Sequence, residues 1–322
     1  MKRALIVRTG AIGDVVETTG LIRALRAAEY CVDYITGDVP AQLLSGDEDI
    51  NEIYILSGKK YMYLFKFAKS LAKNNYDIIL NLQPSLRMKF LCWMIGAKEI
   101  VNYKKTYKYH AVENFFETGK RAIPELVLDK NIKLCIDENL KQRMKNMLDN
   151  KTRIVFNTGA SSARQGRKWA IDNWIKLAEL IYEKYDVQII VIGSKEDEEN
   201  ASALLEKFPQ IKSFAGKTSL KETAALISNT DIVISGDTGP LHISSAAGPV
   251  CIGLYGSCPV SRSGPYGEKH LTIQSELSCS PCDRKVCKYV KSEIDDTLCM
   301  RDIKPEDVMK LINIQMQKKM LI

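Results

Sequence analysis

The chain has 322 residues, of which 45% are hydrophobic and 26% are charged, and its formal net charge is +7 at pH 7. This length suits two domains, and the balance of residues excludes an intrinsically disordered protein. No apolar run approaches the ~18 residues that a membrane-spanning helix needs, and the first ten residues do not resemble a signal peptide. We therefore expect a cytoplasmic protein whose nine cysteines are mostly reduced thiols.

The positive charge is modest and is spread along most of the chain, which predicts mild attraction to acidic partners. One cluster, Lys104, Lys105 and Lys108, is interleaved with tyrosines. This pattern occurs in segments that bind nucleic acid or the phosphates of a membrane surface, and also in solvated loops. Because no nucleic-acid-binding motif accompanies the cluster, we interpret it as a loop or an acceptor-facing surface and expect no nucleic-acid partner.

Strand-like and helix-like segments alternate from the first residues onward, which is typical of a series of βαβ units. In the first half we expect strands at 4–7, 31–35, 53–56 and 77–80, and helices at 15–28, 61–73, 86–95 and 138–148. In the second half we expect strands at 151–156, 187–192, 231–234 and 250–254, and helices at 171–185, 196–207, 220–229 and 305–322.

The alternation predicts an α/β fold with two doubly wound parallel-sheet domains, residues 1–150 and 151–303. A cleft between the carboxyl edges of the two sheets is expected to hold the ligands, because parallel sheets bind ligands at that edge. The final segment, 304–322, is predicted to be a helix that packs across the domain junction.

The segment 231–248, DIVISGDTGPLHISSAAG, predicts a buried strand, a tight turn and a helix N-terminus. Pro240 suits the first helical position. The free backbone N–H groups of Thr238, Gly239 and Leu241 are then expected to face a phosphate or pyrophosphate, which the helix dipole favours. The alternative is an ordinary strand-to-helix connection capped by Asp237 or Thr238.

Two polar side chains, Asp237 and His242, flank this turn. A carboxylate beside a phosphate site is difficult to explain unless hydroxyl groups, such as those of a sugar, are also bound there. A sugar nucleotide meets both demands.

The loop Arg8–Asp14, RTGAIGD, follows the first strand and precedes a helix. Its two glycines allow close backbone approach, but it lacks the third glycine of a dinucleotide fingerprint, so a nicotinamide cofactor is weakly supported. Asp14 is either a helix N-cap or, at the carboxyl edge of the first strand, a general base toward an acceptor hydroxyl.

A second loop, 157–169, again follows a strand and mixes small hydroxyl residues, including Ser161 and Ser162, with cations. The cations are Arg164, Arg167 and Lys168. Such a loop holds a diphosphate leaving group by hydrogen bonds and charge without a metal. A basic surface loop with no ligand is the alternative.

Together these motifs resemble the family-9 glycosyltransferases, whose best-known members are the ADP-heptose:lipopolysaccharide heptosyltransferases. The similarity covers almost the full length. It rests on the opening RTGAIGDVVETTGLIRAL, the central NTGAS and RKWAIDNW, GSKEDEE, the turn GDTGPLHISSAAG, and LYGSCPVSRSGPYG before a cysteine-containing tail.

The resemblance implies a GT-B fold of two Rossmann-like domains, with the acceptor bound by the first and the donor by the second. It implies Asp14 as catalytic base and Gly13 beside it in the donor site. Arg167 is at the position of a lysine that contacts the donor phosphates, which leaves open whether Arg167 or Lys168 has that role. The other residues implied for the donor are Asp197 at the ribose, with Glu196 and Glu198 as alternatives, Thr218 near the adenine, and Asp237, Thr238, Gly239 and His242 in the turn. The loop and turn described above add Ser161, Ser162 and Leu241 to the expected donor-binding residues.

The implied reaction is an inverting transfer of a heptose from ADP-heptose to a lipopolysaccharide core or related lipid-linked saccharide, with no essential metal. Asp14 and Arg167 are the expected catalytic residues, and peripheral contact with the inner face of the cytoplasmic membrane is expected. One alternative is a transferase that uses another nucleotide sugar and a different glycan acceptor. Another is a non-catalytic sugar-nucleotide-binding protein, against which the presence of Asp14 argues.

The tail carries four cysteines, Cys279, Cys282, Cys287 and Cys299. Four thiols at such intervals are able to hold a tetrahedral zinc ion, although the spacing is not that of a standard zinc ribbon. Reduced thiols and a redox function are the alternatives.

Overall fold

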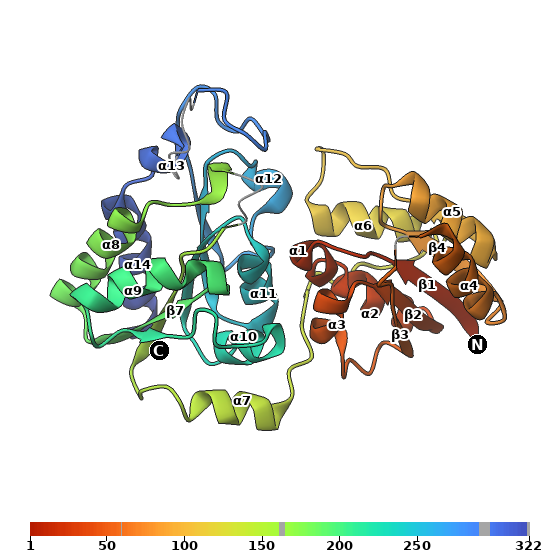
Figure 1. Ribbon diagram of the computed structural model, residues 1–322, viewed down its shortest axis with the longest axis horizontal. Helices are drawn as coiled ribbons and strands as arrows, with labels where there is room; N and C mark the ends of the chain where they lie inside the picture. Colours follow the sequence, from red (N-terminus) through yellow and green to blue (C-terminus); the bar gives the residue numbers. More distant parts are fainter. Residues whose placement is uncertain (59, 161–164, 290–296, 321–322) are drawn as a thin grey trace. The chain divides into compact units, whose positions relative to one another are not determined.

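The computed structural model describes residues 1–58, 60–160, 165–289 and 297–320. The chain divides into two compact units, Met1–Cys135 and Ile136–Ile322. Each unit has its own parallel β-sheet with helices on its faces (Figure 1). The predicted α/β class with two parallel sheets is confirmed.

The first unit has the strand order β3-β2-β1-β4-β5. Its strands are β1 (Lys2–Val7), β2 (Tyr30–Thr36), β3 (Glu52–Ile55), β4 (Tyr76–Asn81) and β5 (Ala97–Asn102). Its helices are α1 (Ile12–Val16), α2 (Thr19–Ala27), α3 (Asp38–Leu44), α4 (Tyr61–Ala72), α5 (Leu86–Ile95) and α6 (Ala111–Lys120). Alternate residues of β1 enter two separate apolar clusters, one with α2 and α6 and one with α4 and α5, so both faces of the sheet are covered.

The second unit has the strand order β11-β10-β9-β6-β7-β8. Its strands are β6 (Thr152–Asn157), β7 (Val187–Ile192), β8 (Lys212–Ser213), β9 (Ile232–Gly236), β10 (Val250–Tyr255) and β11 (Leu271–Gln274). Its helices are α7 (Glu138–Lys145), α8 (Ile171–Lys184), α9 (Glu198–Lys207), α10 (Leu220–Ile227), α11 (Gly239–Ala247), α12 (Val260–Ser263), α13 (Leu298–Asp302) and α14 (Pro305–Met320). Short 3₁₀ turns, η1 (Gln165–Arg167) and η2 (Lys195–Asp197), follow the loops after β6 and β7.

In both sheets the strand order reverses between two central strands, β1 and β4 in the first unit and β6 and β9 in the second. Loops on either side of such a reversal leave the sheet in opposite directions, and this opens a ligand-binding crevice at the carboxyl edge. Asp14 lies in α1, the first helix after β1, and Asp237 directly follows β9. The fold therefore brings both candidate carboxylates to reversal points.

The helix predicted at 15–28 is two helices, α1 and α2. The hydroxyls of Thr18 and Thr19 donate to the carbonyls of Val15 and Val16, and the Thr18 hydroxyl also bonds to the Tyr34 hydroxyl at 2.8 Å. Side-chain bonds of this kind compete with the regular helix ladder. The predicted continuous helix is wrong at this point because local threonine bonds interrupt it.

The unit boundary lies earlier in the chain than residue 150. Helix α7 packs on α10, and the Asn229 amide donates to the Lys141 carbonyl at 2.9 Å. The C-terminal helix α14 packs on α8, and its Val308 and Ile312 are buried in the core of the second unit. Packing of α14 across the junction stays a prediction.

Candidate active site

The reversal point of the second sheet is lined by polar groups. Asn157, the last residue of β6, lies opposite Ser235 of β9 in the strand register. Its side-chain amide donates to the hydroxyls of Ser235 and Thr238, at 2.8 Å in both cases. Sequence reasoning did not assign Asn157 or Ser235 to the site. The available signal was a polar residue at the end of each otherwise apolar strand.

The turn after β9 leads directly into α11. Thr238 is the N-cap, Gly239 is the first helical residue and Pro240 is the second, one position later than predicted. The Leu241 amide donates to the Thr238 carbonyl at 3.1 Å, so its predicted role as a free donor is wrong. No group in the described part of the chain accepts a hydrogen bond from the Gly239 amide. The N-terminus of α11 thus keeps the anion-binding character that helix ends have.

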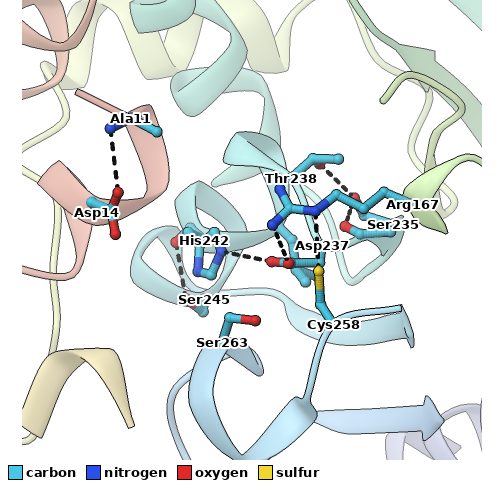
Figure 2. A network of polar contacts seen from close by, with 12 residues as sticks. Ala11, Asp14, Arg167, Ser235, Asp237, Thr238, His242, Ser245, Cys258 and Ser263 are labelled. Carbon is cyan, nitrogen blue, oxygen red and sulfur yellow. Dashed lines mark hydrogen bonds and ion pairs between the residues drawn. The ribbon is translucent and has the colours of Figure 1, made fainter. Parts of the chain in front are cut away.

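Arg167, Asp237, His242 and Cys258 form one cluster beside this turn (Figure 2). The Arg167 Nη2 atom lies 2.7 Å from Asp237 Oδ2, and Arg167 Nε donates to the Cys258 sulfur at 3.3 Å. The His242 Nε2 atom lies 3.4 Å from Asp237 Oδ1. A single carboxylate therefore contacts both the guanidinium and the imidazole.

The carboxylate at the centre of the cluster is almost completely buried, with 4% of the Asp237 side chain exposed. Burial by itself raises the pKa of Asp237, but the hydrogen bond with His242 and the charge of Arg167 outweigh it and lower the pKa to about 2. Burial also raises the pKa of the Cys258 thiol to about 11, and the negative charge of Asp237 adds to that increase. At neutral pH Asp237 is ionised and Cys258 is a thiol.

One close contact fixes the Arg167 backbone at the sheet edge. A Cβ atom on Gly236 would lie 2.3 Å from the Arg167 carbonyl oxygen, so glycine is required for this approach. Nearby, the indole of Trp169 is buried and donates to the Ile303 carbonyl at 3.0 Å. Lys168, between these residues, is half-buried. Ser161, Ser162 and Arg164 lie outside the described residues.

Asp197 and Thr218 lie on neighbouring loops of the same unit. The Asp197 Oδ2 atom accepts hydrogen bonds from the Ser194 amide and hydroxyl, both at 2.7 Å, and lies against Gly159 of the loop after β6. The Thr218 hydroxyl bonds to the Thr223 hydroxyl at 2.8 Å. Thr218 also lines a cavity of about 360 Å³ with Arg143 and Lys212.

In the first unit, Asp14 lies at the reversal point between β1 and β4. It is the third residue of α1 rather than its N-cap, which is Ala11, and it accepts a hydrogen bond from the Ala11 amide at 3.3 Å (Figure 2). It also forms an ion pair with Arg8, which donates to the Leu82 carbonyl at 2.7 Å. Gly13 is buried within α1.

The surroundings of Asp14 suit proton transfer. Its side chain is 26% exposed, whereas that of Arg8 is only 10% exposed and lies over the Phe115 ring. Arg8 therefore holds the carboxylate in one orientation while solvent still reaches it. A positioned carboxylate of this kind is able to accept a proton from a substrate hydroxyl.

The tail cysteines share one cavity of about 170 Å³, lined by Cys279, Cys282, Cys287 and Cys299 among others. Among the residues that the structure describes, the nine cysteines form no disulfide. Burial raises the pKa of Cys299, and its sulfur lies 3.1 Å from the Thr297 hydroxyl. In the part of the chain that the structure describes, no three His, Cys, Asp or Glu side chains are placed to hold a metal ion together.

None of the described helices is both long enough and apolar enough to cross a membrane. The basic-aromatic segment around Lys104 is a loop in which Lys105 lies 4.6 Å from the centre of the Tyr107 ring, and Lys108 lies 5.2 Å from that of Tyr109.

Comparison with known proteins places this site in a family. The model of glycosyltransferase family 9 (heptosyltransferase) matches residues 64–292. The lipopolysaccharide core heptosyltransferase OpsX of Haemophilus influenzae is 24% identical over 298 residues, covering 82% of each chain.

Two solved structures are similar over nearly the whole chain. A family-9 glycosyltransferase from Veillonella parvula gives a TM-score of 0.85 at 19% identity, covering 98% of each chain. The E. coli heptosyltransferase WaaC with ADP gives a TM-score of 0.74 at 18% identity, covering 97% of this chain and 99% of that one. These likenesses show the GT-B fold. Because the family match covers more than half of the sequence, this chain belongs to glycosyltransferase family 9 and is a glycosyltransferase.

Proposed function

We propose that this enzyme transfers a heptose from ADP-heptose to a lipopolysaccharide core or related lipid-linked saccharide, with inversion at the anomeric carbon. The observation that carries the proposal is the anion-binding N-terminus of α11 next to the ion pair of Arg167 with the buried Asp237. The name of the Haemophilus relative supports the sugar and acceptor class, and the ADP in the E. coli structure supports the nucleotide.

The diphosphate of the donor binds at the start of α11 in this proposal. The Gly239 amide and the Arg167 guanidinium supply hydrogen bonds and positive charge, with Lys168 on the same loop. Asp237 acts as a positioning residue, because its carboxylate is already occupied by Arg167 and His242. This explains the carboxylate beside a phosphate site without requiring that it bind sugar hydroxyls.

The remaining donor contacts are assigned by motif. Asp197 is the candidate for the ribose hydroxyls through its Oδ1 atom, since Oδ2 is bonded to Ser194. Thr218 borders a cavity large enough for part of a nucleotide and is the candidate near the adenine. Ser161, Ser162, Gly13 and the buried Leu241 complete the proposed set, with Leu241 supporting the turn by packing.

The reaction is a single displacement. The acceptor oxygen attacks the anomeric carbon, the bond from that carbon to the diphosphate oxygen breaks, and the acceptor proton passes to the Asp14 carboxylate. ADP leaves with its new negative charge stabilised by Arg167 and the α11 N-terminus. Because these groups supply the positive charge, the proposal needs no metal cofactor and no covalent intermediate.

The test is ADP release and acceptor mass after incubation with ADP-heptose and a truncated lipopolysaccharide core. We expect Asp14→Asn to lower the turnover by about 10² to 10⁴ fold while ADP binding is unchanged. Asp38→Asn is the matched control, because Asp38 is also an acidic residue in the first turn of a helix in the same unit. Full turnover by Asp14→Asn contradicts the base assignment.

The same assay separates the alternatives. Transfer only from another nucleotide sugar, or only to another glycan, establishes a different substrate pair on this fold. ADP binding without transfer to any acceptor indicates a sugar-nucleotide-binding protein. Metal analysis of protein purified under reducing conditions without chelators tests the tail cysteines, and bound zinc or iron that is lost in Cys282→Ser assigns them a structural metal.

A further inference from the structure

Cys258 contacts both members of the Arg167–Asp237 ion pair (Figure 2). It follows β10 through Gly256 and Ser257, and only 2% of it is exposed. Its sulfur accepts a hydrogen bond from Arg167 Nε at 3.3 Å. Its S–H group also donates to the Asp237 carboxylate and contributes to the low pKa of that carboxyl. One buried thiol thus joins the guanidinium and the carboxylate.

The backbone around this contact is held in place by the protein itself. The Ser257 amide donates to the Gly166 carbonyl at 3.2 Å, so the residue before Cys258 lies against the residue before Arg167. A Cβ atom on Gly166 would lie 2.6 Å from the Ser257 Cβ atom, and glycine is therefore required for this approach. On its other side, the Ser257 carbonyl accepts a hydrogen bond from the Asp283 amide at 2.7 Å. The sulfur is therefore brought to Arg167 by a fixed loop.

The two contacts of the Arg167 guanidinium differ in charge. Asp237 is an ionised carboxylate, and its Oδ2 atom lies 2.7 Å from Arg167 Nη2. Burial raises the pKa of the Cys258 thiol to about 11, so the second contact is with a neutral group. A second carboxylate at this position would add a negative charge beside Arg167 and weaken its attraction for an anionic ligand. The thiol holds the guanidinium without adding that charge.

The thiol also fixes the orientation of the guanidinium. This group is planar and has five N–H donors in a rigid arrangement. Contacts at both Nε and Nη2 define its plane, whereas the ion pair with Asp237 alone would allow the plane to turn about Nη2. The Arg167 side chain is 23% exposed, so a ligand is able to reach it. The exposed part is then presented to the ligand in one orientation.

We propose that Cys258 is a positioning residue that orients Arg167 toward the diphosphate of the nucleotide-sugar donor. This inference rests on the proposed function, because it takes Arg167 as a ligand of that diphosphate. The sulfur acts through the guanidinium and does not itself bind the donor. Loss of the sulfur leaves the charge of Arg167 in the site but removes its preorganisation toward the phosphate oxygens, and preorganisation contributes to affinity.

The test is ADP binding by the full chain, measured by isothermal titration calorimetry. Cys258→Ala removes the sulfur, and Cys258→Val removes it while filling the space. Each is expected to raise the dissociation constant of ADP about fivefold to tenfold, because one hydrogen bond to a charged group is lost. Cys258→Ser keeps an acceptor for Arg167 Nε and is expected to stay within about threefold of the unchanged protein.

A double-mutant cycle separates positioning from a general effect on the fold. Arg167→Lys keeps a positive charge but lacks the planar group that the thiol orients. In this background we expect Cys258→Ala to change the dissociation constant of ADP by less than about twofold. Cys92→Ala is the matched control, because Cys92 is a buried thiol of the first unit whose pKa burial raises to about 12. It is expected to bind ADP as the unchanged protein does.

Three outcomes overturn the inference. The first is unchanged ADP affinity in Cys258→Ala and Cys258→Val. The second is an equal loss of affinity with Arg167 and with Arg167→Lys, because Cys258 then acts on the fold and not through the guanidinium. The third is a Cys258→Ser protein with a native circular dichroism spectrum that binds ADP no better than Cys258→Ala. Failure of the unchanged protein to bind ADP contradicts the proposed donor site itself, and the two failures are thereby distinguished.

Discussion

The ionisation of the buried Asp237 carboxylate depends strongly on its partners. Asp237 is 3% exposed, and an unpaired charge at such a depth is costly. The contacts with Arg167 and His242 reverse that cost and hold the carboxyl ionised. The same contacts fix the guanidinium beside the α11 N-terminus, so stability and the proposed donor binding depend on one residue.

The pKa of about 2 for Asp237, below the ordinary value of 3.8, makes a prediction about stability. A lowered folded-state pKa stabilises the protein above pH 3.8, and this stabilisation is lost as the pH falls through about 2. It amounts to about 2 kcal/mol at neutral pH. In urea unfolding we expect Asp237→Asn to be less stable by about this amount at pH 7, with the difference decreasing toward pH 3.

A difference that is equal at the two pH values argues against ionisation as its cause. Asp38→Asn, at an exposed position in the first turn of α3, serves as the control and is expected to change the free energy of unfolding only slightly.

For single residues, the sequence predicted the candidate site best where its functional residues are neighbours in the chain. The turn from Asp237 to His242 could be predicted because strand, turn and helix signals follow one another. The partners of its carboxylate could not, since Arg167 and Cys258 come from distant loops that meet only at the sheet edge. The Arg8 contact of Asp14 was not predicted either. The sequence also did not distinguish an N-cap from the third helical residue at Asp14, because these two positions differ only in local backbone conformation.

At the scale of elements, buried strands were predicted best. Strands β1, β7 and β9 are apolar, β-branched runs covered on both faces, and such runs stand out in a sequence. The partly exposed edge strand β5 was missed, because its residues AKEIVN lack a clear apolar run. Helix α6 was missed because polar residues such as Asn114 and Thr118 are buried in it through hydrogen bonds.

The start of β11 supplies a pH-dependent contact between elements. His270 accepts a hydrogen bond at Nδ1 from the Cys251 amide of β10 at 3.1 Å. Burial, with the nearby charge of Lys269, lowers its pKa to about 4 from 6.5. The neutral ring is therefore the form that the folded chain accommodates.

Since the folded-state pKa of His270 is lowered, its stabilisation is complete above pH 6.5 and is lost as the pH falls from 6.5 to about 4. We expect the free energy of unfolding to fall by about 2 kcal/mol over this range, allowing for the partial exposure of the ring. His270→Gln keeps an acceptor but does not titrate. The free energy of unfolding of this variant, measured in urea at several pH values, should therefore lack this part of the decrease with falling pH. An unchanged slope assigns the pH dependence to other groups.

For the whole molecule, the division into two units with separate cores has a spectroscopic consequence. Trp169 and Trp174 pack edge to face in the core of the second unit, with ring centres 5.0 Å apart. Trp93, the other tryptophan, is 70% exposed in the first unit. Unfolding transfers only the first two from an apolar core to water, so the shift in tryptophan emission reports mainly on the unit proposed to bind the donor.

This division predicts how a nucleotide changes thermal unfolding. At 100 times its dissociation constant, a ligand that binds only the folded state stabilises it by about 2.7 kcal/mol, which corresponds to about 5 to 10 °C for a unit of this size. We expect ADP to raise the emission midpoint by this amount and UDP to raise it far less. Arg167→Met should remove most of the ADP effect, because it deletes the charge beside the α11 N-terminus. If saturating concentrations of every adenine nucleotide leave the midpoint unchanged, the second unit does not bind the proposed donor.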